Sequence, residues 1–173
     1  MTASVFTPRL LYALLAAWPL AASAQNKPAG FGWFETVIGS CWAGVLPDGT
    51  TRHEHCYSTQ FGHFIRGTSA LTVQKDGQRV KQFEGDSLFA WDEKRKQIVY
   101  YIWGSDGSHR QLDAQYIGDE LAFPIPSRAD PGKVAYRSVW RRVDAESIEV
   151  RRERPDGAGW RTDLTVLYSR GKN

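Results

Sequence analysis

The sequence has few of the features that identify an enzyme or a nucleic-acid-binding protein. It contains one Met and two Cys, and it carries no Gly-x-Ser-x-Gly motif, phosphate-binding loop or Rossmann fingerprint. Its formal net charge of +3 is small for a dedicated nucleic-acid binder. No low-complexity linker interrupts its 173 residues. The composition therefore predicts one domain that does not bind nucleic acid and has no evident catalytic centre.

Long apolar stretches are also scarce. The apolar run Leu10 to Ala17 follows Arg9 and precedes the small residues Ala22 to Ala24. This order is typical of a secretory signal peptide. The run is shorter than the roughly 20 residues that span a bilayer, so a membrane anchor is the weaker interpretation. We expect cleavage after residue 24, a mature domain over residues 25–173, no stable membrane insertion, and a periplasmic or secreted location.

Aromatic residues are abundant, and they lie between regularly spaced turns. The chain has seven Trp, eight Phe and seven Tyr, and aromatic residues favour strands. Stretches of strand length are separated by Asp-Gly turns, which favour hairpins because glycine accepts positive φ. These turns are Asp48-Gly49, Asp76-Gly77, Asp106-Gly107 and Asp156-Gly157. Weaker turns alternate with them, so the Asp-Gly turns should lie at one end of an up-and-down sheet.

The segments between turns predict ten strands and one short helix. The strands are expected at Cys41 to Leu46, Thr51 to Gln60, His63 to Gln74, Gln78 to Trp91 with a bend at Gly85-Asp86, Ile98 to Trp103, His109 to Ile117, Glu120 to Ile125, Val134 to Val143, Ile148 to Arg154 and Trp160 to Ser169. The helix is expected over Phe31 to Ile38, where apolar residues recur every three or four positions. The predicted fold is all-β: an antiparallel up-and-down (meander) barrel with this N-terminal helix plugging one end. A two-sheet sandwich is the alternative.

Three residues near the ends of the mature chain resemble a known group of barrels. Gly39 and Trp42 stand at the start of the first strand, and Arg170 stands at the end of the last. In this respect the chain resembles the calycins: the lipocalin, fatty-acid-binding and nitrobindin-like barrels. The resemblance implies that Arg170 covers Trp42 at a closed end of the barrel. The chain departs from the lipocalin pattern because two residues, rather than one, separate Gly39 from Trp42.

Whether the two cysteines can form a disulfide depends on the register of the first hairpin. One register places Cys41 opposite Cys56, at a separation that a disulfide can bridge in an oxidising compartment. Pro47-Asp48-Gly49 also suits a turn with a glycine bulge, which would put Cys56 on the other face of the sheet. We expect the first register, with a structural rather than catalytic disulfide.

The same register, with Trp42 inward as in calycins, turns His53, His55 and Tyr57 toward the cavity. Two histidines two positions apart on one strand face could supply two metal or haem contacts. No third ligand is evident, and nitrobindin-like haem proteins use a C-terminal histidine, whereas this chain has none after His109. We therefore expect these three side chains to contact a ligand near the barrel mouth, without a metal or haem.

The last two strands suggest further residues of the cavity. Alternate residues from Trp160 to Arg170 form the more apolar face, so we expect Trp160 and Leu164 to point inward. Pairing the preceding strand with that face turns Arg152 inward as well. An inward guanidinium needs a carboxylate. Fatty-acid-binding relatives use such an arginine for an acidic ligand, and the alternative is a cross-strand salt bridge with a glutamate.

The predicted function is a non-catalytic barrel that binds a small apolar or amphipathic ligand. One alternative is a small-substrate enzyme with acid–base groups supplied by the cavity histidines and tyrosine. Another is an envelope interaction module with a filled barrel. Its contact surface would be Ser87 to Trp91 and Ile98 to Trp103, which are apolar on both faces. These two segments lie either beneath the N-terminal helix or in a homodimer interface.

Overall fold

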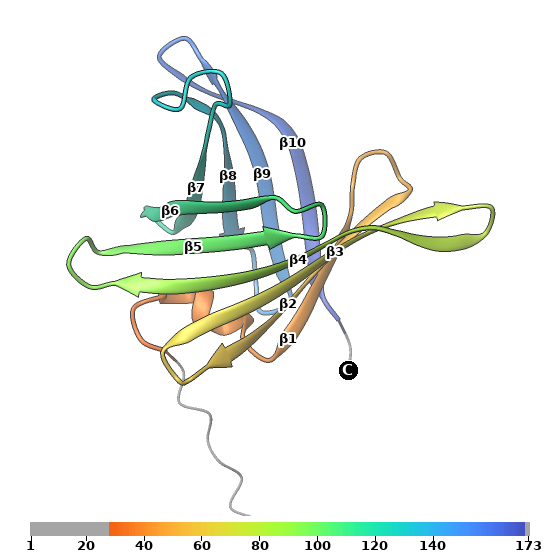
Figure 1. Cartoon of the computed structure of the whole chain (residues 1–173), viewed down its shortest axis with the longest axis horizontal. Helices are drawn as coiled ribbons and strands as arrows, with labels where there is room; N and C mark the ends of the chain where they lie inside the picture. The colour runs from red at the N-terminus through yellow and green to blue at the C-terminus, as the bar shows by residue number, and fades with distance from the viewer. Residues whose placement is uncertain (1–27, 172–173) are drawn as a thin grey trace, which may run out of the picture.

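Each strand of the described chain, residues 28–171, pairs with the next strand in sequence, and the last pairs with the first (Figure 1). The strands of this computed structural model are β1 (Ser40–Val45), β2 (Thr51–Gln60), β3 (Phe64–Lys75), β4 (Gln78–Asp92), β5 (Gln97–Gly104), β6 (His109–Ile117), β7 (Glu120–Pro126), β8 (Val134–Arg142), β9 (Ser147–Asp156) and β10 (Gly159–Arg170). The predicted ten-stranded meander barrel is confirmed. A two-sheet sandwich is not formed, because the pairing of β1 with β10 closes the sheet.

The expected signal peptide lies outside the described residues. Within residues 28–171, no helix is long and apolar enough to cross a bilayer.

The Asp-Gly turns connect β1 to β2, β3 to β4, β5 to β6 and β9 to β10. Each of their glycines has a positive φ, between 60° and 79°. Asp48 accepts hydrogen bonds from the backbone N–H groups of Thr50 and Thr51, and its pKa falls to about 2 because bonds to Thr51 and Thr50 stabilise the carboxylate. Because successive strands are antiparallel, all four turns lie at one end of the barrel, as the sequence predicted.

The register of the first hairpin and the contact at the other end also agree with expectation. Cys41 pairs with Cys56 across β1 and β2, and the two form a disulfide. Trp42 pairs with Arg170 across β1 and β10, and the guanidinium carbon lies 5.1 Å from the centre of the buried indole. The closed barrel and this contact are consistent with a calycin-like fold.

The N-terminal segment forms a short 3₁₀-helix, η1 (Gly32–Val37), where the sequence predicted a helix over Phe31 to Ile38. The 3₁₀-helix begins at Gly32, whose φ of 56° is a left-handed value. Phe31, Phe34 and Val37 of this segment are fully buried. Phe34 packs against rings from three strands, Tyr57 of β2, Phe89 of β4 and Trp140 of β8, with centroids 4.9–5.9 Å apart.

One irregularity changes which residues of β10 face inward. The pairing of β9 with β10 shifts between Thr162 and Leu164, so Asp163 has no partner in the ladder. One extra residue reverses the alternation of side chains. Leu164 therefore packs toward the core, whereas Trp160 is 40% exposed and lies 4.2 Å below the Arg137 guanidinium. The prediction that Trp160 faces the interior is wrong, because it assumed unbroken alternation.

Candidate functional site

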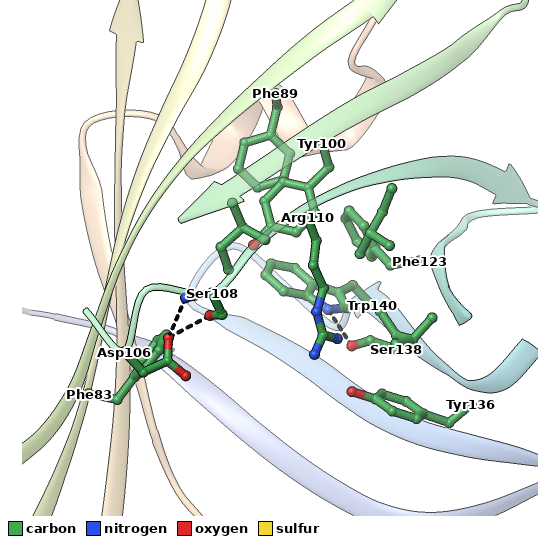
Figure 2. A pocket seen from close by; sticks show the side chains of 13 residues that line it. Phe83, Phe89, Tyr100, Asp106, Ser108, Arg110, Phe123, Tyr136, Ser138 and Trp140 are labelled. Carbon is green, nitrogen blue, oxygen red and sulfur yellow. Dashed lines mark hydrogen bonds between the residues drawn. The ribbon is translucent and has the colours of Figure 1, made fainter. Parts of the chain in front are cut away.

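The interior of the barrel is packed on one side and hollow on the other. The hollow is a cavity of about 340 Å³ bounded by β4, β5, β6, β7 and β8 and by the Asp-Gly turn after β5. Figure 2 shows its lining: Phe83, Phe89, Tyr100, Ile102, Asp106, Ser108, Arg110, Leu112, Phe123, Ile125, Tyr136, Ser138 and Trp140. Because Asp106 and Ser108 belong to the Asp-Gly end, the cavity reaches the end of the barrel opposite Trp42.

The deeper wall of the cavity is aromatic. The rings of Phe89 and Tyr100 stack with centroids 4.4 Å apart, and Phe123 meets Tyr100 edge-on at 5.5 Å. Trp140 lies 5.3 Å from Phe123 and donates its indole N–H to Ser138 at 2.8 Å. Burial raises the pKa of Tyr100 to about 12, so its hydroxyl remains protonated. This wall offers an uncharged surface to the apolar part of a ligand.

Two charged side chains complete the lining. Asp106 accepts hydrogen bonds from the backbone N–H and the hydroxyl of Ser108, at 3.0 and 2.6 Å, and these bonds lower its pKa. The Arg110 guanidinium lies among the other lining side chains in Figure 2. Among residues 28–171, no carboxylate forms a salt bridge with Arg110. The cavity lining therefore includes one exposed arginine that forms no salt bridge within residues 28–171, and one carboxylate that is engaged by its own turn and whose pKa the Arg110 charge also lowers.

The barrel wall is weakly joined beside this cavity. Strands β6 and β7 pair only over Gln115–Ile117 and Glu120–Ala122, next to the turn that connects them. Beyond that point the two strands run in different directions (Figure 1). Arg110 and Phe123 lie on the two diverging segments and both line the cavity. A ligand that enters between β6 and β7 would break no backbone pairing between these segments.

The structure brings His53, His55 and Tyr57 together, but on the packed side of the interior. The two imidazole centroids are 4.0 Å apart, and His53 Nδ1 lies 2.8 Å from the Tyr168 hydroxyl. Burial lowers the pKa of His53 to about 4 and that of His55 well below its usual value. None of the three lines the cavity between β4 and β8. Within the described residues, no cluster of His, Cys, Asp or Glu could hold a metal ion.

Arg152 lies on the inner face, where the sequence predicted it. It pairs with Ser138 of β8 and with Leu164 of β10, so its side chain has the same orientation as that of the cavity-lining Ser138. Its Nε donates to Asp163 at 2.7 Å, and Arg154 donates to the other oxygen of that carboxylate. The counter-ion in this structure is the bulge aspartate, whereas the sequence suggested either a ligand's carboxylate or a cross-strand glutamate. Neither Arg152 nor Leu164 lines the cavity.

The sequence-based site residues include none of the side chains that line the cavity, and Arg110 is among those missed. Its inward orientation could be predicted from the alternation of side chains along β6, because Arg110, Leu112 and Ala114 share one face of that strand. The apolar character of Leu112 and Ala114 marks that face as inward. The alternation does not reveal that the space beside Arg110 is hollow. The hollow depends on where the aromatic side chains of the core pack inside the barrel.

No protein-family model matches the chain, and no curated protein sequence matches it.

Proposed function

We propose that this protein binds, without transforming, a small amphipathic ligand whose apolar body fills the cavity between β4 and β8 and whose anionic group contacts Arg110. The observation that carries the proposal is a hollow of about 340 Å³ with aromatic walls and, at its exposed edge, one arginine that forms no salt bridge within residues 28–171. A periplasmic or secreted location is part of the proposal. The Cys41–Cys56 disulfide is compatible with such a compartment.

The volume sets the size of the ligand. The cavity lies near the lower end of the roughly 300–1,000 Å³ range of small-molecule pockets. It corresponds to the volume of roughly ten water molecules at about 30 Å³ each. The ligand expected from this volume is a compact compound of one to three rings or a short acyl chain.

The charges set the polarity of the ligand. An anionic group would accept hydrogen bonds from Arg110, which forms no salt bridge within the described chain, whereas the Asp106 carboxylate already accepts two hydrogen bonds from Ser108. Hydrogen bonds to charged groups contribute about 1.5–3 kcal/mol each. Loss of one such contact should therefore weaken binding by roughly 10- to 150-fold.

The position of the histidines supports binding rather than catalysis. Acid–base catalysis requires a titratable group within hydrogen-bond reach of the substrate. His53 and His55 are packed against Tyr168 and do not line the cavity. Tyr100, which does line it, has a pKa of about 12 and is a poor proton donor at neutral pH.

Two fluorescent probes that differ by one charge test the proposal. 1-Anilinonaphthalene-8-sulfonate is anionic, and N-phenyl-1-naphthylamine has the same aromatic skeleton without the sulfonate. Both should bind the natural sequence. Arg110→Leu should weaken the anionic probe at least tenfold and change the affinity for the neutral probe less than threefold. The control Arg79→Leu removes an exposed arginine of β4 outside the cavity lining and should alter neither.

A second variant tests whether the probes occupy the cavity. Ser138→Phe introduces a ring among the lining residues and should weaken both probes together. The proposal is wrong if both probes bind Ser138→Phe as they bind the natural sequence, or if Arg110→Leu weakens both probes equally while the circular dichroism spectrum is unchanged.

A further inference from the structure

The outer face of β4 and β5 carries an aromatic pair, an exposed tryptophan and a half-buried tyrosine, that the cavity does not use. Trp103 is 49% exposed, and its ring lies parallel to that of Tyr101, with an interplanar angle of 15° and centroids 6.3 Å apart. Both residues point outward, because Tyr100 and Ile102, which alternate with them along β5, line the cavity. The N-terminal segment packs through Phe34 against Phe89 on the inner face, so it does not explain this pair.

Two shallow hollows share Trp103 and extend from it in opposite directions along β4, and polar side chains line both. One, of about 280 Å³, is lined by Gln60, Arg66, Asp86, Ser87, Leu88 and Trp103. The other, of about 360 Å³, is lined by Thr68, Ser69, Glu84, Gly85, Asp86, Trp103, Gly104 and Ser105. They share only Trp103 and Asp86, and neither contains a residue of the interior cavity.

A fixed ion pair stands between the two hollows. Arg66 Nε donates to Asp86 Oδ1 at 3.1 Å, and Arg66 Nη2 donates to Oδ2 at 2.7 Å. The bond from Arg66 holds the pKa of Asp86 below its usual value. About half of each side chain remains exposed. The pair therefore presents a positioned planar donor and a positioned planar acceptor beside an indole face.

We propose that this outer face binds a carbohydrate, with consecutive sugar units of an unbranched glycan lying on the two sides of Trp103. A pyranose ring has a face of C–H groups and a rim of hydroxyl groups. The C–H face would stack on the exposed indole, which is amphipathic and rigid. The hydroxyl rim would exchange hydrogen bonds with Arg66 and Asp86 in the centre, and with Gln60 and Glu84 at the two outer walls.

The arrangement of charge favours a glycan over a macromolecule of another class. The core of a protein–protein interface is depleted in charged residues, whereas here Arg66 and Asp86 lie directly beside the exposed tryptophan. Nucleic acid requires an excess of positive charge. The two hollows contain one arginine and two carboxylates, those of Asp86 and Glu84.

Isothermal titration with four unbranched tetrasaccharides, cellotetraose, maltotetraose, laminaritetraose and tetra-N-acetylchitotetraose, tests the proposal. At least one should bind, and Trp103→Ala should weaken that binding tenfold or more. Asp86→Asn keeps the shape of the side chain but removes its charge, and it should weaken binding as well. The matched control is Trp160→Ala, since Trp160 is 40% exposed but covered by Arg137. That variant should bind the sugar as the natural sequence does.

Binding of the anionic naphthalene probe in the interior serves as the folding control, because it should be unchanged in Trp103→Ala. Failure of all four tetrasaccharides to bind at millimolar concentration overturns the glycan proposal and leaves the cavity proposal intact. So does equal loss in Trp103→Ala and Trp160→Ala. A concentration-dependent dimer that Trp103→Ala dissociates would identify this face as a contact between copies of the chain and would also overturn the proposal.

Discussion

The buried imidazoles should make the folded protein lose stability as the pH falls from 7 to 5. His53 has a pKa of about 4 in the folded protein and 6.5 as a free side chain, because burial disfavours its charged form. Below pH 6.5 the unfolded chain therefore binds a proton that the folded chain does not, and the free energy of unfolding decreases. At about 1.4 kcal/mol per pKa unit, the complete effect of His53 is about 3 kcal/mol. About 2 kcal/mol of it is expected between pH 7 and pH 5.

Urea unfolding followed by tryptophan fluorescence at pH 7 and pH 5, at constant ionic strength, measures this loss. Carboxylates contribute little in this window, because free Asp and Glu are mostly ionised at pH 5. His55 should add to the loss in the same direction, since its pKa is also lowered by burial. His53→Gln should reduce the difference between the two pH values by about 2 kcal/mol. The control His63→Gln alters an exposed side chain and should leave the difference unchanged.

The difference between the two pH values is the informative quantity, because His53→Gln also changes the contact with Tyr168 and with it the stability at pH 7. If His53→Gln loses as much stability between pH 7 and pH 5 as the natural sequence, the neutral, buried state of His53 is refuted. The interpretation of this side of the barrel as packed would then fail with it.

Two further predictions concern stability. Replacing both Cys41 and Cys56 by Ser should lower the free energy of unfolding by about 3 kcal/mol, because the disulfide closes a loop of about 15 residues; a urea titration that shows a loss below about 1 kcal/mol would contradict the prediction. Phe34→Ala should cost about 3–5 kcal/mol, since that ring is fully buried among three strands. Phe61→Ala, at a ring that is 81% exposed, should change the same titration by less than about 0.5 kcal/mol, and equal losses would show that the packing of Phe34 in the core does not stabilise the fold.

The parts of the fold that the sequence predicts well are those that depend on local chemistry. The Asp-Gly turns fix which strands are neighbours, and the turn at Gly49 allows the register that pairs Cys41 with Cys56. Once that register is set, the inward direction of His53 and His55 follows from alternation together with the inward Trp42 that the calycin resemblance implies. The closed meander then follows from strand count and the absence of long connections.

The parts that the sequence does not predict depend on contacts between distant residues. The bulge at Asp163 places a carboxylate where Arg152 and Arg154 of the neighbouring strand can both reach it. No local sequence pattern indicates that Asp163 leaves the strand pairing and forms these two salt bridges instead. The cavity is equally non-local. Phe34 and the rings around it fill one side of the interior, and the cavity beside Arg110 is the part of the interior that these rings do not fill.

The central claim is that the hollow beside Arg110 holds a small amphipathic anion. Native mass spectrometry of the protein purified from its own host tests this claim most directly, with Arg110→Leu purified in parallel. We expect one small molecule per chain, released on denaturation, carrying an acidic group and an apolar body, and largely missing from Arg110→Leu. Recovery of the polypeptide alone, or of a molecule whose occupancy is equal in both proteins, would contradict the account.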